Sequence, residues 1–152
     1  MTPTPKRREG RRLAMLAIFA QNSADYDLPL TLSLMRDMNP KWQTLPPFTV
    51  ALCEAVERHR EEISVTLTAI LEHWKLDRVA PVERAILQLA CAEIDYFPDI
   101  PPRVTITEYL ELAKAYAPEQ APGFINGILD RLVHLRGKED FQAGKIIRRA
   151  GH

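Results

Sequence analysis

The segment best suited to bind a ligand through charge is the start of the chain. Residues 1–12 carry a net charge of +4, because five basic side chains accompany a single acid, Glu9. The basic residues are Lys6, Arg7, Arg8, Arg11 and Arg12. Positive charge at this density attracts polyanions such as nucleic acids. The alternative interpretation is an ordinary solvated helix start.

The remaining charge is distributed unevenly, although the chain as a whole is neutral with 20 basic and 20 acidic residues. Residues 136–152 carry a net charge of +3, and residues 13–135 therefore carry −7. Basic ends on an acidic body favour one surface for a polyanion and a second surface for something else.

Side chains typical of catalysis or metal binding are present, but their spacing is wrong for either. The four histidines, at positions 59, 73, 134 and 152, form no H-E-x-x-H motif and no i,i+4 pair, so a helical zinc site lacks its ligands. The sequence contains no G-x-S-x-G, Walker or G-x-G-x-x-G motif. Cys53 and His59 lie six residues apart on one predicted helix, which places them on opposite faces. We therefore expect a protein that is not an enzyme and that uses no metal and no cofactor.

The cysteines and the apolar runs bear on the cellular compartment. Cys53 and Cys91 belong to no C-x-x-C pair and lie among apolar neighbours, which predicts buried, reduced thiols in a cytoplasmic protein. Basic residues followed by LAMLAIFA are slightly similar to a secretory signal, but a small-x-small cleavage site is missing just after the run. No other apolar run approaches the roughly 20 residues of a membrane span, so no membrane association is expected.

Helical periodicity runs through the sequence, and no alternating strand pattern is convincing. Seven helices are predicted, over residues 7–22, 30–38, a third opening at the prolines 46–47, then 60–74, 81–97, 104–117 and 119–135. Short, proline-marked connections make this an all-α bundle. We predict one domain over residues 1–136, with helical sub-bundles of about 1–75 and 76–136, followed by a basic, loose tail over 137–152.

The first predicted helix changes character along its length. At 100° per residue, its four arginines share one face, and the opposite face carries Leu13, Leu16, Ala17 and Ala20. The last two turns are apolar nearly all round. Either the fold or a partner must cover that end.

Most aromatic side chains occupy positions typical of a core, namely Phe19, Trp74, Tyr109 and Tyr116. Phe124 differs, because it lies in the first turn of the last predicted helix, after Pro122 and Gly123. There it either stacks a base, beside backbone N–H groups that meet a phosphate, or packs into the bundle as a hydrophobic staple.

Three blocks of sequence carry a specific resemblance to a known family. VERAILQLACAEI, DIPPRVTITEYLELAKAY and GFINGILDRL resemble the signature blocks of the NusB family of bacterial transcription antitermination factors. The arginine-rich start followed by A-x-x-A-[IL]-[FY] resembles that family's first helix. The likeness covers essentially the whole chain, and residues 81–132 are its most specific part.

The resemblance implies an all-α fold of two helical sub-bundles and no catalysis. It implies binding of a short single-stranded RNA element, boxA, in ribosomal and phage transcripts. It also implies a partner, the small-subunit ribosomal protein that doubles as NusE. Within the transcription elongation complex, the two proteins help RNA polymerase to read through terminators.

The basic motif of the family falls on the start of the chain. By position, Arg7, Arg8 and Arg11 match it and are expected to contact RNA phosphates. Lys6 and Arg12 add to the same patch. Because phosphate contacts carry affinity rather than sequence choice, base recognition must come from elsewhere.

The other implied site residues lie farther along the chain. Phe124 and Asn126 match the F-[VI]-N-G block near the RNA site, and Gln120 stands at an often acidic position beside it. Phe19 matches the aromatic residue that ends the first helix, and Glu83 matches the acid in V-E-[RK]-A. These last two are expected near the protein partner.

Departures from the family pattern cluster around the expected RNA surface. Glu9 stands where a third arginine is common, and Gly123 replaces a common Lys or Arg. Thr107 replaces the Asn of the usual I-N-E, and Tyr109 follows in place of a small residue. These changes bear on RNA affinity more than on the fold.

Three rival interpretations follow. The same helical domain precedes the catalytic domain of certain ribosomal RNA cytosine methyltransferases, but the chain leaves no room for a cofactor-binding sheet, which favours the stand-alone factor. A second is a helical protein-interaction or dimerisation module with a masked or lost RNA surface, since some family members form homodimers through the surface that would face RNA. An enzyme is the least favoured.

Overall fold

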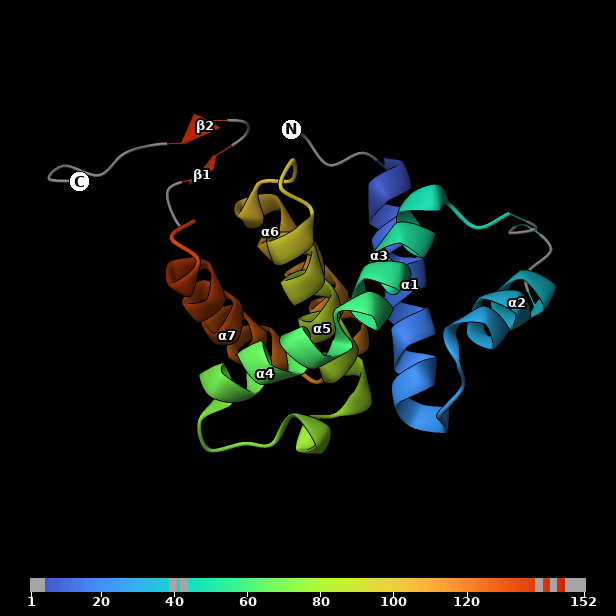
Figure 1. Ribbon diagram of the computed structural model, residues 1–152, viewed down its shortest axis with the longest axis horizontal. Helices are drawn as coiled ribbons and strands as arrows, with labels where there is room; N and C mark the ends of the chain where they lie inside the picture. Colours follow the sequence, from blue (N-terminus) through green and yellow to red (C-terminus); the bar gives the residue numbers. More distant parts are fainter. Residues whose placement is uncertain (1–4, 39–40, 42–43, 139–140, 143–144, 147–152) are drawn as a thin grey trace, which may run out of the picture.

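The protein is built around one central helix. The computed structural model describes residues 5–38, 41, 44–138, 141–142 and 145–146, and in it the central helix is α5, Pro81–Tyr96. The others are α1 (Pro5–Ala24), α2 (Leu28–Met38), α3 (Pro47–Arg58), α4 (Arg60–Leu71), α6 (Pro102–Tyr116) and α7 (Ala121–Leu135). The predicted all-α fold is confirmed (Figure 1).

Helix α5 contacts α1, α3, α4, α6 and α7. Every residue from Ala85 to Ile94 is buried, so this stretch of the helix is covered on all sides. That explains why its sequence is apolar nearly all round. Helix α2 lies at the edge of the molecule, where it packs against α1 and α3 (Figure 1). The division into two sub-bundles stays a prediction.

Prolines begin several helices. Pro47, Pro81 and Pro102 are the first residues of α3, α5 and α6. Proline fits there because the first N–H groups of a helix have no partner within it, and the ring fixes φ near the helical value. The predicted helix over 60–74 is too long, since α4 ends at Leu71 and Glu72 adopts a φ of 53°.

Helices α1 and α3 approach closely at Gly10. A Cβ atom on Gly10 would lie 3.2 Å from Cδ2 of Phe48. The hydroxyl of Thr49, which is buried, donates a 2.9 Å hydrogen bond to the Gly10 carbonyl oxygen. The guanidinium carbons of Arg7 and Arg11 lie 4.9 and 5.3 Å from the Phe48 ring centroid. This crossing fixes the basic start of α1 against α3.

The prediction that four aromatic side chains lie in the core is wrong for three of them. Tyr109 is fully buried, but Phe19, Trp74 and Tyr116 are 39%, 61% and 44% exposed. Trp74 leaves the core because α4 ends before it, and Tyr116 because it is the last residue of α6. Both are therefore available to a ligand.

The predicted buried thiols are confirmed. Cys53 and Cys91 are free and buried. Burial raises the pKa of each thiol to about 12, because the charged thiolate would lose its solvation. Neither thiol is therefore a reactive nucleophile near neutral pH.

The C-terminal end differs from the purely helical expectation. Gly137, with a φ of 65°, follows α7 as predicted. Strands β1 (Phe141–Gln142) and β2 (Lys145–Ile146) then form a short antiparallel pair that the sequence did not indicate. The rest of the predicted tail, residues 139–140, 143–144 and 147–152, lies outside the described residues.

Candidate nucleic-acid interface

The basic side chains at the start of α1 have unequal exposure. Lys6 and Arg8 are exposed, Arg7 and Arg12 are half-buried, and Arg11 is buried. The cause is that α1 rests on α3, α5 and α6, so only part of its circumference faces solvent. The predicted basic face is therefore divided between the surface and the interior.

Arg8 reaches across from α1 to α6. Its Nε and Nη2 atoms each donate a 3.0 Å hydrogen bond to the Glu108 carboxylate. The Arg8 side chain is 69% exposed, whereas that of Glu108 is 3% exposed. This two-point contact, which raises the pKa of Arg8, fixes the guanidinium plane and leaves Nη1 outside the pair.

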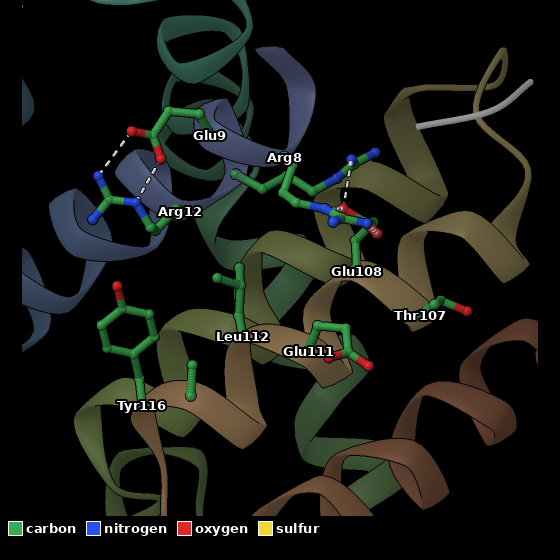
Figure 2. Close-up of a pocket in the computed structure, with 10 residues that line it drawn as sticks. Arg8, Glu9, Arg12, Thr107, Glu108, Glu111, Leu112 and Tyr116 are labelled. Carbon is green, nitrogen blue, oxygen red and sulfur yellow. Dashed lines mark hydrogen bonds and ion pairs between the residues drawn. The ribbon is translucent and has the colours of Figure 1, made fainter. Parts of the chain in front are cut away.

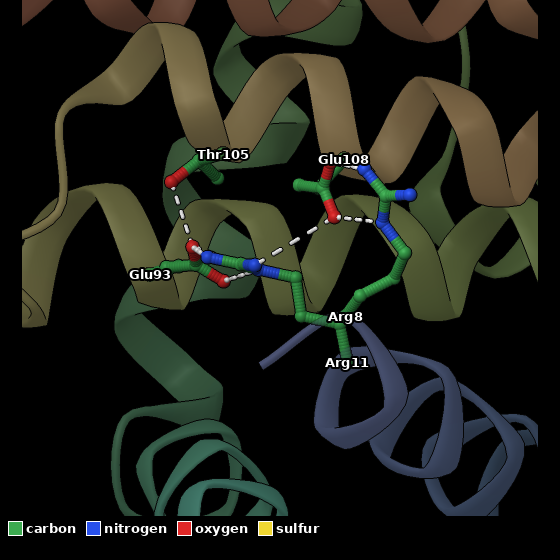
Figure 3. A network of polar contacts seen from close by, with 5 residues as sticks. All are labelled: Arg8, Arg11, Glu93, Thr105 and Glu108. Atoms are coloured by element: carbon green, nitrogen blue, oxygen red, sulfur yellow. Dashed lines mark hydrogen bonds and ion pairs between the residues drawn. The ribbon is translucent and has the colours of Figure 1, made fainter. Parts of the chain in front are cut away.

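The expectation that Arg11 contacts RNA phosphates does not fit its position. Its side chain is 1% exposed and hydrogen bonds to Glu93, which is fully buried (Figure 3). The Nη2–Oε1 distance is 2.6 Å, and both Glu93 oxygens lie 3.1 Å from Nε. A phosphate cannot reach this guanidinium without opening the interface between α1 and α5.

The surroundings of Arg11 form a connected polar network across three helices (Figure 3). Thr105 on α6 donates a 2.8 Å hydrogen bond to Glu93 on α5. Nη1 of Arg11 lies 4.0 Å from Glu108, the same carboxylate that binds Arg8. Burial by itself lowers the pKa of Arg11, but the hydrogen bonds and charge of Glu93 outweigh it and raise that pKa. Arg11 thus holds α1 against α5 and α6.

Arg12 is paired within its own helix. Its Nε and Nη2 atoms both donate to the Glu9 carboxylate, the second at 2.9 Å. This contact lowers the pKa of Glu9. Hydrogen bonding to Glu9 and then to Tyr116 raises the pKa of Arg12. The acid that departs from the family pattern therefore neutralises its neighbour.

A hollow of about 510 Å³ lies between the start of α1 and α6 (Figure 2). From α1 it is lined by Arg8, Glu9, Arg11 and Arg12. From α6 it is lined by Thr107, Glu108, Glu111, Leu112, Ala115 and Tyr116. Arginines held rigidly at the rim of a hollow are suited to binding phosphate groups, because little side-chain freedom is lost on contact.

A second hollow, of about 390 Å³, is lined both by residues expected to bind RNA and by a residue expected to bind the protein partner. Gln120 and Phe124, expected at RNA, line it together with Glu83, expected at the protein partner. Trp74 and Arg78, from the connection between α4 and α5, complete its polar and aromatic wall. The two expected surfaces therefore adjoin at the start of α7.

Phe124 is half-buried and packs against the hydrophobic core as well as lining this hollow. Its backbone N–H already donates a 3.4 Å hydrogen bond to the Gln120 carbonyl oxygen. The expected free amide at Phe124 is therefore engaged, and only the ring is offered to a ligand. Asn126 is half-buried on α7 and Phe19 is exposed on α1, and neither lines the two hollows.

Several residues of the site were not predicted as such. Glu93 and Glu108 pair with the arginines, and Tyr116 and Trp74 present aromatic rings. Glu93 carried a usable signal, because it continues the apolar stripe of α5 at a core position, where a charge requires a partner. The partner itself, 82 positions away, could not be identified from that stripe.

Among the residues that the structure describes, no group of three or more His, Cys, Asp or Glu side chains could hold a metal ion. Within the same residues, no helix is long and apolar enough to cross a membrane.

Solved structures with the same architecture define the class of this protein. The NusB structure from T. maritima matches with a TM-score of 0.77 at 30% identity, covering 88% of this chain and 93% of the other. A crystal structure of antitermination factors NusB and NusE with double-stranded RNA matches with a TM-score of 0.77 at 25% identity, covering 88% and 99%. The protein is a helical protein of the NusB fold.

Sequence comparisons extend this from fold to family. The sequence model of the NusB family matches residues 8–134. Transcription antitermination protein NusB of Trichlorobacter lovleyi is 36% identical over 126 residues, covering 83% of this chain and 89% of the relative. The Bacillus subtilis protein of the same name is 35% identical, covering 84% and 94%. The chain belongs to the NusB family.

Proposed function

We propose that this protein is a cytoplasmic transcription antitermination factor that binds boxA-like single-stranded RNA together with the ribosomal protein NusE. In this role it joins the transcription elongation complex and promotes read-through in ribosomal RNA operons. Its relatives carry the name transcription antitermination protein. The observation that carries the proposal is the exposed, rigidly held Arg8 at the rim of the hollow between α1 and α6.

The phosphate-binding part of the proposal uses Lys6, Arg7, Arg8 and Arg12. Arg8 is presented by the buried Glu108, and its Nη1 atom lies outside that pair. Arg11 is not proposed to contact RNA directly. Its pair with Glu93 holds α1, and the exposed arginines on it, in place. Each phosphate contact contributes about −0.7 to the slope of log K against log salt for single strands.

The base-reading part uses the second hollow. There the Phe124 ring offers a face for stacking, and Gln120 offers polar groups for base edges. Asn126, two residues after Phe124 on α7 and outside the hollow, is proposed to add a further polar contact. Backbone contacts alone do not distinguish one sequence from another. A boxA preference therefore depends on this end of α7.

The protein partner is proposed to bind beside the RNA, at Phe19 and Glu83. Supporting this, a NusB structure contains NusE and double-stranded RNA together. Glu83 shares the second hollow with Phe124 and Gln120, so a partner touching Glu83 borders the RNA. Ligands bound side by side also contact each other, so we expect each to raise the other's affinity, and by the same factor, because coupling between binding sites is reciprocal.

The test is fluorescence anisotropy with a labelled boxA-like oligomer and a scrambled oligomer of equal composition, each with and without NusE. We expect the boxA-like oligomer to bind more tightly, and NusE to increase that affinity. Glu83→Gln is expected to reduce the increase caused by NusE by more than it changes RNA binding by the chain alone, which is measured in parallel because Glu83 lines the second hollow. Glu61→Gln, the same substitution at an exposed residue of α4 that lines neither hollow, serves as control. Equal binding of both oligomers, with or without NusE, contradicts the proposal.

A further inference from the structure

Tyr116 is an aromatic residue that the fold does not require and that no role described so far explains. It is the last residue of α6, and its side chain is 44% exposed. It lines the hollow between α1 and α6 (Figure 2). An exposed ring beside a cavity is suited to stacking on a planar ligand.

The Tyr116 ring lies below Arg12, with its hydroxyl turned toward that residue (Figure 2). Arg8 and Arg12 lie four residues, or about 6 Å along the axis, apart on the same face of α1. Both line the same cavity of about 510 Å³ as the Tyr116 ring. Cavities of about 300–1,000 Å³ are typical of sites for small organic ligands.

Three carboxylates also line this hollow, and each already has a basic partner. Glu9 binds Arg12, and Glu108 binds Arg8. Glu111 accepts a 3.1 Å hydrogen bond from Lys114. The negative charge facing a phosphate is thus offset within the protein, and the fork-shaped pairs orient the arginines without using all of their N–H groups.

We propose that this hollow is a subsite for one nucleotide of the bound single-stranded RNA, in which the Tyr116 ring stacks on the base while Arg8 and Arg12 bind the flanking phosphates. The inference rests on the proposed RNA-binding function and adds to it a second base-stacking position, separate from Phe124. The occupant is a nucleotide because the cavity combines an aromatic face with cationic groups on one side.

The first measurement compares the RNA affinity of Tyr116→Leu with that of Tyr116→Phe. Loss of the ring should weaken binding at least about fivefold, whereas loss of the hydroxyl alone should change it by less than about twofold. The matched control is Tyr26→Leu, since Tyr26 is 45% exposed and does not line the hollow. It should bind as the wild type does. Equal affinities of all three variants and the wild type overturn the subsite.

The second measurement identifies the base. Oligomers carrying a single abasic nucleotide at successive positions are titrated against the wild type and Tyr116→Leu. When the abasic nucleotide lies at the position that faces Tyr116, the two proteins should bind equally, because the missing base leaves nothing for the ring to stack on. A Tyr116→Leu defect of the same size at every position overturns the subsite. A wild type that binds no oligomer, with NusE present, overturns the proposed function and the subsite with it.

A third measurement needs no variant and so does not depend on how a variant folds. Ultraviolet irradiation of wild-type protein with 5-iodouridine-substituted RNA crosslinks aromatic rings that stack on the modified base. Mass spectrometry is expected to place a crosslink on Tyr116 for the position found by the abasic series. Crosslinks confined to other residues contradict the subsite.

Discussion

Arg8 and Arg11 lie three residues apart on α1 and reach opposite environments. Arg8 is exposed against a buried carboxylate, and Arg11 is buried against another. Both stay charged, since their carboxylate partners raise both pKa values. Side chains that look equivalent in the sequence thus divide into one that is offered to RNA and one that holds the helix in place.

Replacing Arg11 by Met should destabilise the fold more than it affects RNA contacts. Glu93, fully buried, would be left as an unpaired charge, which typically costs about 3–5 kcal/mol. Urea unfolding measures this loss. The double variant Arg11→Met/Glu93→Gln should recover part of it, because the remaining amide is neutral and still accepts from Thr105. If Arg11→Met is as stable as the wild type and binds RNA weakly, Arg11 is a direct contact after all.

Replacing Glu9 by Gln should strengthen RNA binding. The change frees Arg12 from its carboxylate and removes one negative charge, so the net charge at the start of α1 rises by one. A partly exposed pair of this kind is worth about 1 kcal/mol, so an increase of about two- to fivefold is expected at low salt. Anisotropy titration measures it. Glu57→Gln is the matched control, because Glu57 pairs with Arg60 at the same i,i+3 spacing. Weaker binding by Glu9→Gln would contradict a dominant effect of charge and would indicate that Arg12 depends on Glu9 for its orientation.

At the scale of elements, helix positions could largely be predicted, because proline starts and apolar periodicity are local signals. The end of α4 and the exposure of Trp74 could not be predicted. The helix ends before Glu72, which has a positive φ, whereas the residue types that usually mark such an end are glycine and asparagine. The packing of α1 on α3 through Gly10 also escaped prediction, because it depends on residues 39 positions away.

That crossing gives a prediction about stability. Gly10→Leu should destabilise the protein by about 1–3 kcal/mol, since a side chain there must displace the Phe48 ring. Gly127→Leu on α7 is the control, because a Cβ there meets no atom within 4 Å and glycine is a poor helix former. It should be neutral or stabilising. Thermal unfolding of both variants measures the difference, and equal melting temperatures would contradict the close approach.

At the scale of the whole molecule, charge placement matters more than net charge, which is zero. The sequence located the basic segment and, through the family blocks, the start of α7. It did not show that three of the five basic residues are paired with acids, Arg8 with Glu108, Arg11 with Glu93 and Arg12 with Glu9. The first two pairs could not be predicted because each joins helices that are distant in the sequence. RNA binding must therefore come from a small, local set of contacts, and its salt dependence should be correspondingly modest.

The most direct test is a salt titration of binding to a boxA-like oligomer with NusE present. It compares the wild type with Lys6→Ala/Arg8→Ala/Arg12→Ala and with a control, Arg58→Ala/Arg60→Ala/Arg131→Ala, that removes the same charge elsewhere. The first triple variant should bind more weakly, with a slope of log K against log salt shallower by up to about 2. The control should match the wild type. Equal losses in both variants, or no binding by the wild type, would contradict an RNA surface at the start of α1.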